Sequence, residues 1–208
     1  MIFRDPVHMT EELGMLRDTV RRFVADEVTG KGDAWEKEGR TPKSVLKKLG
    51  DLGVLGVRYP AEYGGSELDT LATVALHEEL GRSTYGGFHA MVSVHTDMAS
   101  PHLARYGTDE QKQKYMPAII AGDILTAVAV TEPGAGSDVA GISTKAVRDG
   151  NGWRLNGRKI FITNGATADV LFVAAKTDSS VKGSRGISIF IVERDTPGFE
   201  TARTLDKT

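Results

Sequence analysis

The chain has no cysteine among its 208 residues, which excludes disulfides, thiolate metal ligands and a cysteine nucleophile. It also has no excess of one charge, because 26 Lys and Arg stand against 28 Asp and Glu, for a formal net charge of −2. Such a balance offers no basic footprint for nucleic acid and no attraction to an anionic membrane surface. The longest nearly uncharged stretch, Ile124–Thr131, is far too short to span a bilayer, so we expect no membrane insertion.

No targeting signal is visible at the start of the sequence. Met1–Glu12 carries Asp5, Glu11 and Glu12 and has no apolar segment, unlike a secretory signal or an Arg-rich transit peptide. The absence of cysteine fits a reducing compartment. We therefore expect a cytoplasmic protein of the bacterial type. With 40% hydrophobic and 26% charged residues, the composition is that of an ordinary globular protein.

The first part of the chain has the spacing of capped helices. Thr10 and Asp69 each precede apolar residues at helical intervals, and Thr108–Gln111 has the capping-box pattern. Thr41-Pro42 predicts another helix, with the threonine as N-cap and the proline at the first helical position. A further helix is expected over Gly87–Ala99, where a proline follows shortly after.

Beyond Gly122 the apolar period changes from helical to two. Asp149–Gly152 and Asn156-Gly157 have the composition of hairpin turns. The predicted strands, rich in β-branched residues, are Ile124–Val130, Trp153–Leu155, Lys159–Thr163, Val170–Lys176 and Ile187–Glu193.

Helices followed by strands indicate segregated domains rather than an alternating α/β fold. The predicted fold class is multi-domain α and β, with an all-helical N-terminal domain over residues 1–124 and a β domain over residues 125–208. Arg203–Thr208 resembles the start of another element with nothing to close it, and a sheet cut there leaves an unpaired edge. We therefore expect the β domain to be incomplete.

Two familiar motifs are present only in part. Gly134-Ala-Gly136 lacks the third glycine of a dinucleotide fingerprint, since Val139 occupies that position, and no βαβ unit surrounds it. His77–Gly81 begins like a zinc-protease helix but has glycine where the second histidine is needed. The other histidines show no ligand spacing, so no metal site is expected.

The segment Thr131–Asp138 has the features of a ligand-binding turn. Pro133 makes the turn rigid, glycines at 134 and 136 let backbone approach a ligand closely, and Thr131 and Ser137 supply hydroxyls. The alternative is a tight surface turn that only reverses the chain. A second segment, Lys159–Gly165, ends in Thr-Asn-Gly, and together the two segments can present two hydroxyls to one flat ligand.

These two segments, read as Val130–Asp138 and Asn156–Gly165, resemble the paired signature of the acyl-CoA dehydrogenase family. The resemblance covers essentially the whole sequence, although only about half of a typical family chain, and it inclines to the long-chain branch through His95–Asp97 and Asp195–Phe199. Further matching blocks are Leu52–Val57, Glu62–Gly65, Tyr106–Lys112, Gly186–Glu193 and Thr196–Phe199.

The resemblance implies an architecture and an activity. The family has a helical N-terminal domain, an antiparallel β-barrel-like middle domain and a C-terminal four-helix bundle, and the bundle is absent from this sequence. Members usually form homotetramers, bind FAD and convert acyl-CoA to trans-2-enoyl-CoA, with electrons passing to an electron-transfer flavoprotein. The catalytic Glu of the family lies in the C-terminal bundle, so no catalytic residue is expected here, and the 208-residue chain alone is predicted to be inactive.

The resemblance also implies roles for individual residues. Backbone and hydroxyl groups near the flavin pyrimidine rim suit a site where hydride transfer leaves negative charge. His95 aligns with the region that lines the acyl pocket, where a packed helix residue is the alternative. The expected cofactor-binding residues are Val128, Val130, Thr131, Phe161, Ile162 and Thr163, and the expected substrate-binding residues are Ser137 and His95.

Two other functions stay open at this point. An acyl-CoA oxidase or a nitroalkane-oxidase-like flavoenzyme shares the architecture and differs in letting oxygen reach the reduced flavin. A natural half-chain, in contrast, would be a non-catalytic binding module.

Overall fold

The computed structural model describes residues 10–181 and 183–205. Contacts divide the chain into two compact units, one made of Met1–Ser93 with Thr108–Asp123 and the other of Val94–Gly107 with Ile124–Thr208. The segment 94–107 is helical and nevertheless groups with the strands. The domain boundary expected after residue 124 stays a prediction, and the ends of both expected domains lie outside the described residues.

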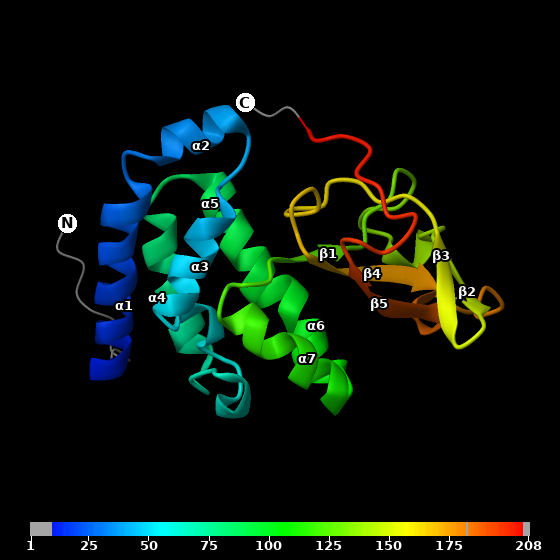
Figure 1. Cartoon of the computed structure of the whole chain (residues 1–208), viewed down its shortest axis with the longest axis horizontal. Helices are drawn as coiled ribbons and strands as arrows, with labels where there is room; N and C mark the ends of the chain where they lie inside the picture. The colour runs from blue at the N-terminus through cyan, green and yellow to red at the C-terminus, as the bar shows by residue number, and fades with distance from the viewer. Residues whose placement is uncertain (1–9, 182, 206–208) are drawn as a thin grey trace. The chain divides into compact units, whose positions relative to one another are not determined.

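The described part of the first unit consists of helices joined by loops. Thr10, Asp69 and Thr108 each accept a hydrogen bond from the first turn that follows, and Thr108 forms a complete capping box with Gln111, as predicted. The helices, drawn in Figure 1, are α1 (Glu11–Phe23), α2 (Gly32–Glu38), α3 (Lys43–Asp51), α4 (Thr70–Gly81), α5 (Gly86–Ser93) and α7 (Asp109–Ile120), with π-helical η1 (Val24–Val28) and 3-10 turns η2 (Val54–Gly56) and η3 (Ala61–Tyr63).

The predicted cap at Thr41 is wrong. Helix α3 begins at Lys43, and Pro42 itself takes the N-cap position with an extended backbone, at ψ 137°. Thr41 therefore lies one residue outside the helix, and Pro42 makes no side-chain cap.

A buried carboxylate joins α1 to α4 in this unit. Glu79 of α4 is fully buried and pairs at 2.9 Å with Arg17 Nε and Arg21 Nη2 of α1, and at 2.9 Å with Arg82 Nε. Burial alone would raise the pKa of Glu79, but the hydrogen bonds from Arg21 and Arg17 outweigh it and hold the pKa below its ordinary value. The two helices lie side by side in Figure 1. The ion pairs of Glu79 link them.

The second unit contains the sheet. Its helical segments are π-helical η4 (Val94–Ala99), α6 (Ser100–Tyr106) and the 3-10 turns η5 (Val139–Gly141) and η6 (Gly183–Gly186). The helix predicted to stop at Ala99 continues into α6, because Pro101 lies in the first turn of α6, where no backbone N–H is needed. The strands are β1 (Thr126–Ala129), β2 (Lys145–Asp149), β3 (Gly152–Asn156), β4 (Val170–Lys176) and β5 (Ile187–Glu193).

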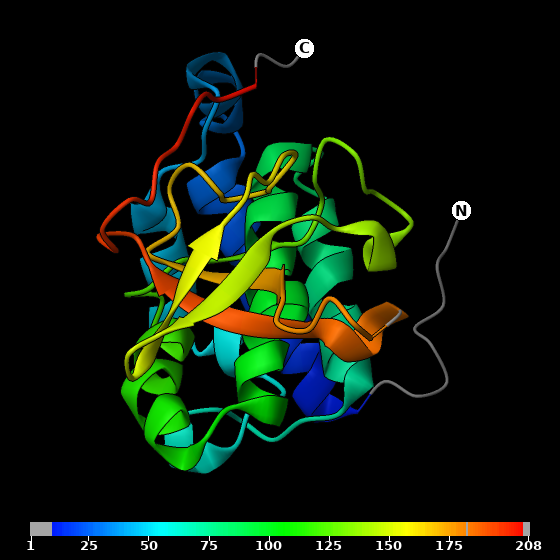
Figure 2. The same cartoon turned by 90° about the vertical axis from the view of Figure 1, so that its right-hand side faces the viewer.

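The sheet is mixed, which corrects the expectation of an antiparallel one. Strand β4 is central and buried along most of its length; it pairs with β1 and β2 in parallel and with β5 antiparallel. Parallel pairing of β1 with β4 needs a long crossover, and the whole β2–β3 hairpin lies between them in the chain. That hairpin turns at Asp149–Gly152, as predicted, and forms the twisted ribbon in Figure 2.

We predict that Glu79→Gln lowers the free energy of unfolding by about 3 kcal/mol at pH 7, because the buried partner of three arginines loses its charge. The pKa of Glu79 is depressed in the folded state, so this contribution is complete above the unfolded pKa and is lost as pH falls through the folded one. Urea titrations at pH 7 and pH 3 measure both effects.

Glu78→Gln is the matched control for this prediction. Its side chain is 50% exposed and pairs with Arg17 at 2.9 Å, so its loss should cost less than about 1 kcal/mol. Equal losses for the two variants would show that burial of Glu79 does not matter.

Candidate functional site

A tight turn follows β1 and carries the first motif. The Glu132 N–H donates to Ala135 O at 2.9 Å, and the Ala135 N–H donates to Glu132 O at 3.1 Å. Pro133 and Gly134 are therefore the two central residues, and proline suits the first of these because its ring fixes φ. The chain does reverse here, and the same turn also places a carboxylate in the protein interior.

The carboxylate of Glu132 is buried and accepts five hydrogen bonds. Its Oε2 accepts from Ser143 N–H at 2.5 Å and from Ser143 Oγ at 2.7 Å. Its Oε1 accepts from Thr144 N–H at 3.0 Å, Thr144 Oγ1 at 2.5 Å and Lys159 Nζ at 2.8 Å. Burial alone would raise the pKa of Glu132, but these donors hold the pKa well below its usual range. The group is therefore ionised at neutral pH.

Lys159 links the two motif segments. Its Nζ donates to Val130 O at 2.9 Å as well as to Glu132, and its side chain is only 11% exposed. The next residue continues the link, because Ile160 N–H donates to Thr131 O at 3.0 Å. The structure thus places the start of the first segment directly against Lys159 and Ile160 of the second.

The predicted strand at Lys159–Thr163 is wrong. Phe161 has φ +56° and Asn164 has φ +64°, both in the left-handed region, whereas strands need strongly negative φ. The segment is a loop. Asn156-Gly157 is likewise no hairpin turn, because β3 ends at Asn156 and the next strand of the chain is β4.

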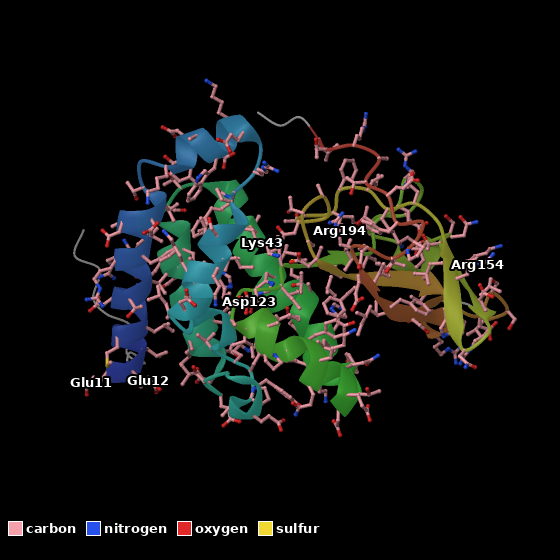
Figure 3. All side chains as sticks on the ribbon, in the orientation of Figure 1. Glu11, Glu12, Lys43, Asp123, Arg154 and Arg194 are labelled. Atoms are coloured by element: carbon pink, nitrogen blue, oxygen red, sulfur yellow. The ribbon has the colours of Figure 1, made fainter. Side chains whose placement is uncertain are left out.

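Side chains fix this loop at several points. Asn164 Nδ2 donates to Thr126 O at 3.0 Å, and asparagine tolerates a left-handed backbone better than most residues. Arg194, labelled in Figure 3, follows β5 and donates to Gly165 O at 2.7 Å and to Ala168 O at 2.8 Å. Together with Lys159 at its start, these contacts hold a loop that has no regular structure.

The predicted site residues differ in exposure. Phe161 is 68% exposed, which is unusual for a side chain of its size. Val128 lies in β1 opposite Phe172 of β4. The half-buried side chains are Val128, Val130, Thr131 and Ile162, and the exposed ones are Ser137, Phe161 and Thr163. Their contacts with a ligand stay predictions.

His95 lies in the interior of the second unit. It is fully buried in η4, and its Nδ1 accepts from Thr126 N–H at 3.2 Å and contacts Thr126 Oγ1 at 2.9 Å. An acceptor at Nδ1 leaves the ring proton of neutral His95 on Nε2. Ser100 Oγ donates to His95 O at 2.6 Å. The geometry is that of the packed residue weighed above, and a substrate contact stays a prediction.

Sequence reasoning missed the residues that build the site's frame. Glu132 was part of the motif but had no assigned role, although a carboxylate directly after a buried strand needs a partner. Lys159, at the head of the second motif, offered a matching cation. Ser143, Thr144 and Arg194 gave no local signal, because their contacts span distances along the chain that a pattern does not reveal.

Within residues 10–181 and 183–205, no three His, Asp or Glu side chains gather as metal ligands do. In the same ranges, every helix is too short or too polar to cross a membrane.

Comparison with family models matches both parts of the chain. Residues 10–123 match the acyl-CoA dehydrogenase N-terminal domain, and residues 127–208 match the acyl-CoA dehydrogenase middle domain. A helical half followed by a strand-rich half is the order of domains in a class of flavoenzymes, one of which is solved as a complex with FAD. The chain belongs to the acyl-CoA dehydrogenase family.

Individual relatives agree with the family models. Isovaleryl-CoA dehydrogenase from Pongo abelii is 43% identical over 96% of this chain and 48% of its own length. An acyl-CoA dehydrogenase structure from Geobacillus kaustophilus is 44% identical, with TM-score 0.92, and covers 97% of this chain and 53% of that one. An acyl-CoA dehydrogenase complexed with FAD from Bacillus anthracis is 36% identical, with TM-score 0.88, over 97% of this chain and 34% of that one. The chain thus spans about half, or less, of the relatives it matches.

Gly157→Ala should destabilise the folded protein, because the added Cβ would collide with Thr144. A Cβ at this position would lie 2.2 Å from Thr144 Oγ1 and 2.7 Å from Thr144 Cα, so backbone must move next to the Glu132 network. We expect a loss of about 2 kcal/mol in the free energy of unfolding, measured by urea titration.

Gly134→Ala is the control, because a Cβ there meets nothing within 4 Å and the backbone is not left-handed. It should leave the free energy of unfolding within about 0.5 kcal/mol of the wild-type value. An unchanged Gly157→Ala protein would show that Thr144 can move freely.

Proposed function

We propose that this chain forms the helical and flavin-binding portions of an FAD-dependent acyl-CoA dehydrogenase. The proposed reaction removes an α-proton and a β-hydride from an acyl-CoA thioester and yields the trans-2-enoyl-CoA, with electrons passing to an electron-transfer flavoprotein. The observation that carries the proposal is the junction at Lys159 and Ile160, which holds Val130 and Thr131 against the loop that follows β3. The FAD complex of the Bacillus anthracis relative supports it.

The residues at this junction suit an isoalloxazine ring, which has apolar faces and a polar edge. Phe161 offers an exposed aromatic side chain, and the hydroxyls of Thr131 and Thr163 are polar groups on the two adjoining segments. Bound FAD supplies the acceptor for the hydride that leaves the acyl chain. Val128, Val130 and Ile162 would add apolar contacts beside it.

The resemblance to the acyl-CoA dehydrogenase family implies a role for each of these residues, and the chemistry of each side chain suits that role. The Thr131 and Thr163 hydroxyls would donate to the edge of the ring and favour the negative charge that develops there. Phe161 and Ile162 would exclude water from the ring. Ser137, exposed just beyond the turn, would contact the thioester end of the substrate.

Glu132 does not suit the role of general base. Both of its oxygens are occupied by donors, and its pKa is held well below the usual range, so it has little tendency to take a proton. This agrees with the expectation that the family's catalytic Glu comes from the C-terminal bundle. The expected homotetramer and the expected inactivity of the 208-residue chain alone stay predictions.

The visible spectrum of the full-length protein encoded by the gene tests the proposal. A flavin spectrum that bleaches anaerobically with one acyl-CoA of a graded panel would support dehydrogenation and name the chain length. Rapid oxygen consumption after bleaching would instead indicate an oxidase. A protein that binds no flavin, even when FAD is added, would overturn the proposal.

Phe161→Gly separates stability from cofactor binding. A left-handed backbone costs a residue with a Cβ about 1–2 kcal/mol, whereas glycine loses about 0.5–1 kcal/mol through chain entropy. The free energy of unfolding of the FAD-free protein should therefore stay the same or rise by up to about 1.5 kcal/mol. The Kd for FAD should rise about tenfold, because the aromatic contact is lost.

Urea titration and fluorescence titration with FAD measure the two quantities. Val147→Ala removes another exposed apolar side chain, 62% exposed on β2, and should change neither. Unchanged FAD affinity in Phe161→Gly would remove Phe161 from the proposed site.

A further inference from the structure

We propose that Lys159 is a positioning residue that tunes the flavin through one peptide group, so that the reduced cofactor binds more tightly relative to the oxidised one. The carbonyl of Val130, which accepts from Lys159 Nζ at 2.9 Å, and the N–H of Thr131 belong to the same peptide. The inference rests on the proposed function, because it requires FAD beside Val130 and Thr131.

The physical link is polarisation. A charge-assisted hydrogen bond draws electron density toward the carbonyl oxygen, which makes the N–H at the other end of the peptide a stronger donor. Hydride transfer to FAD bound here would bring two electrons and one proton, and would leave the ring system with one additional negative charge. A stronger donor and a nearby cation stabilise that charge, so they favour the reduced form over the oxidised one.

Glu132 does not cancel this effect. Its carboxylate also accepts from the backbone and hydroxyl groups of Ser143 and Thr144, so its negative charge is distributed toward those residues. Lys159 Nζ reaches both Glu132 Oε1 and Val130 O. The pair therefore acts as a dipole whose positive end touches the Val130 carbonyl, while Glu132 keeps the ammonium in place.

Lys159→Met in the full-length protein tests the inference. We expect the Kd for reduced FAD, relative to that for oxidised FAD, to rise about tenfold, which is a fall of about 30 mV for a two-electron couple. Spectroelectrochemical titration measures the reduction potential of the bound flavin. Fluorescence titration measures the Kd for oxidised FAD. Lys159→Arg should recover most of the wild-type potential, because it restores the cation.

Lys145→Met is the matched control, since Lys145 is exposed at the start of β2 and its loss removes the same charge. It should leave the potential unchanged. If Lys159→Met does not fold, Glu132→Gln/Lys159→Met removes both buried charges together, and it should lower the potential in the same direction by a smaller amount.

The outcomes separate the two proposals. A wild-type protein that binds no FAD would overturn the proposed function and this inference together. Flavin binding with an unchanged potential in Lys159→Met or the double variant, or an equal weakening of both oxidation states, would overturn the inference alone. A fall in potential that Lys159→Arg does not recover would also overturn it, because the charge would not be the cause.

Discussion

The second unit depends on the requirement that a buried carboxylate be fully partnered. An ionised group in a protein interior costs several kcal/mol unless hydrogen bonds and an opposite charge replace water. Glu132 meets this need with donors from Ser143, Thr144 and Lys159. Ser143 and Thr144 directly precede β2, and Lys159 lies in the loop after β3. Because moving either segment away would leave the charge of Glu132 without these partners, both segments are held against the turn after β1. We infer that this buried pair specifies the arrangement of the two segments rather than adding much net stability, since desolvation of both charges offsets their attraction.

That arrangement explains how a loop can carry the proposed site. The segment after β3 has no ladder of backbone hydrogen bonds, and yet it is tied by Lys159 at its start, Asn164 in its middle and Arg194 at its end. The carbonyls that receive these bonds include those of β1 and of the loop itself. Loops held on a rigid sheet in this way are where binding residues are commonly found.

The parts of the fold that follow local rules were predictable from the sequence. The caps at Thr10, Asp69 and Thr108 use side chains and backbone within three residues of one another, so pattern alone finds them. The strand β4 shows a continuous β-branched and apolar run. Lys159–Thr163 is also rich in β-branched residues but is a loop, because tertiary contacts of Lys159 and Asn164 override a propensity worth about 1 kcal/mol.

The site's frame was not predictable, since its key contacts join residues far apart in the chain. Both motif segments were recognised, but their adjacency depends on Lys159 contacting Val130, and the whole β2–β3 hairpin separates these two residues in the chain.

The contacts that hold this loop also bear on its affinity for a ligand. Phe161 has a left-handed backbone that is unfavourable by itself, and the contacts of Lys159 and Asn164 on either side hold it in place. A site whose backbone is already ordered spends less binding free energy on ordering itself, so the strain in this loop is what preorganisation of the proposed flavin site would cost.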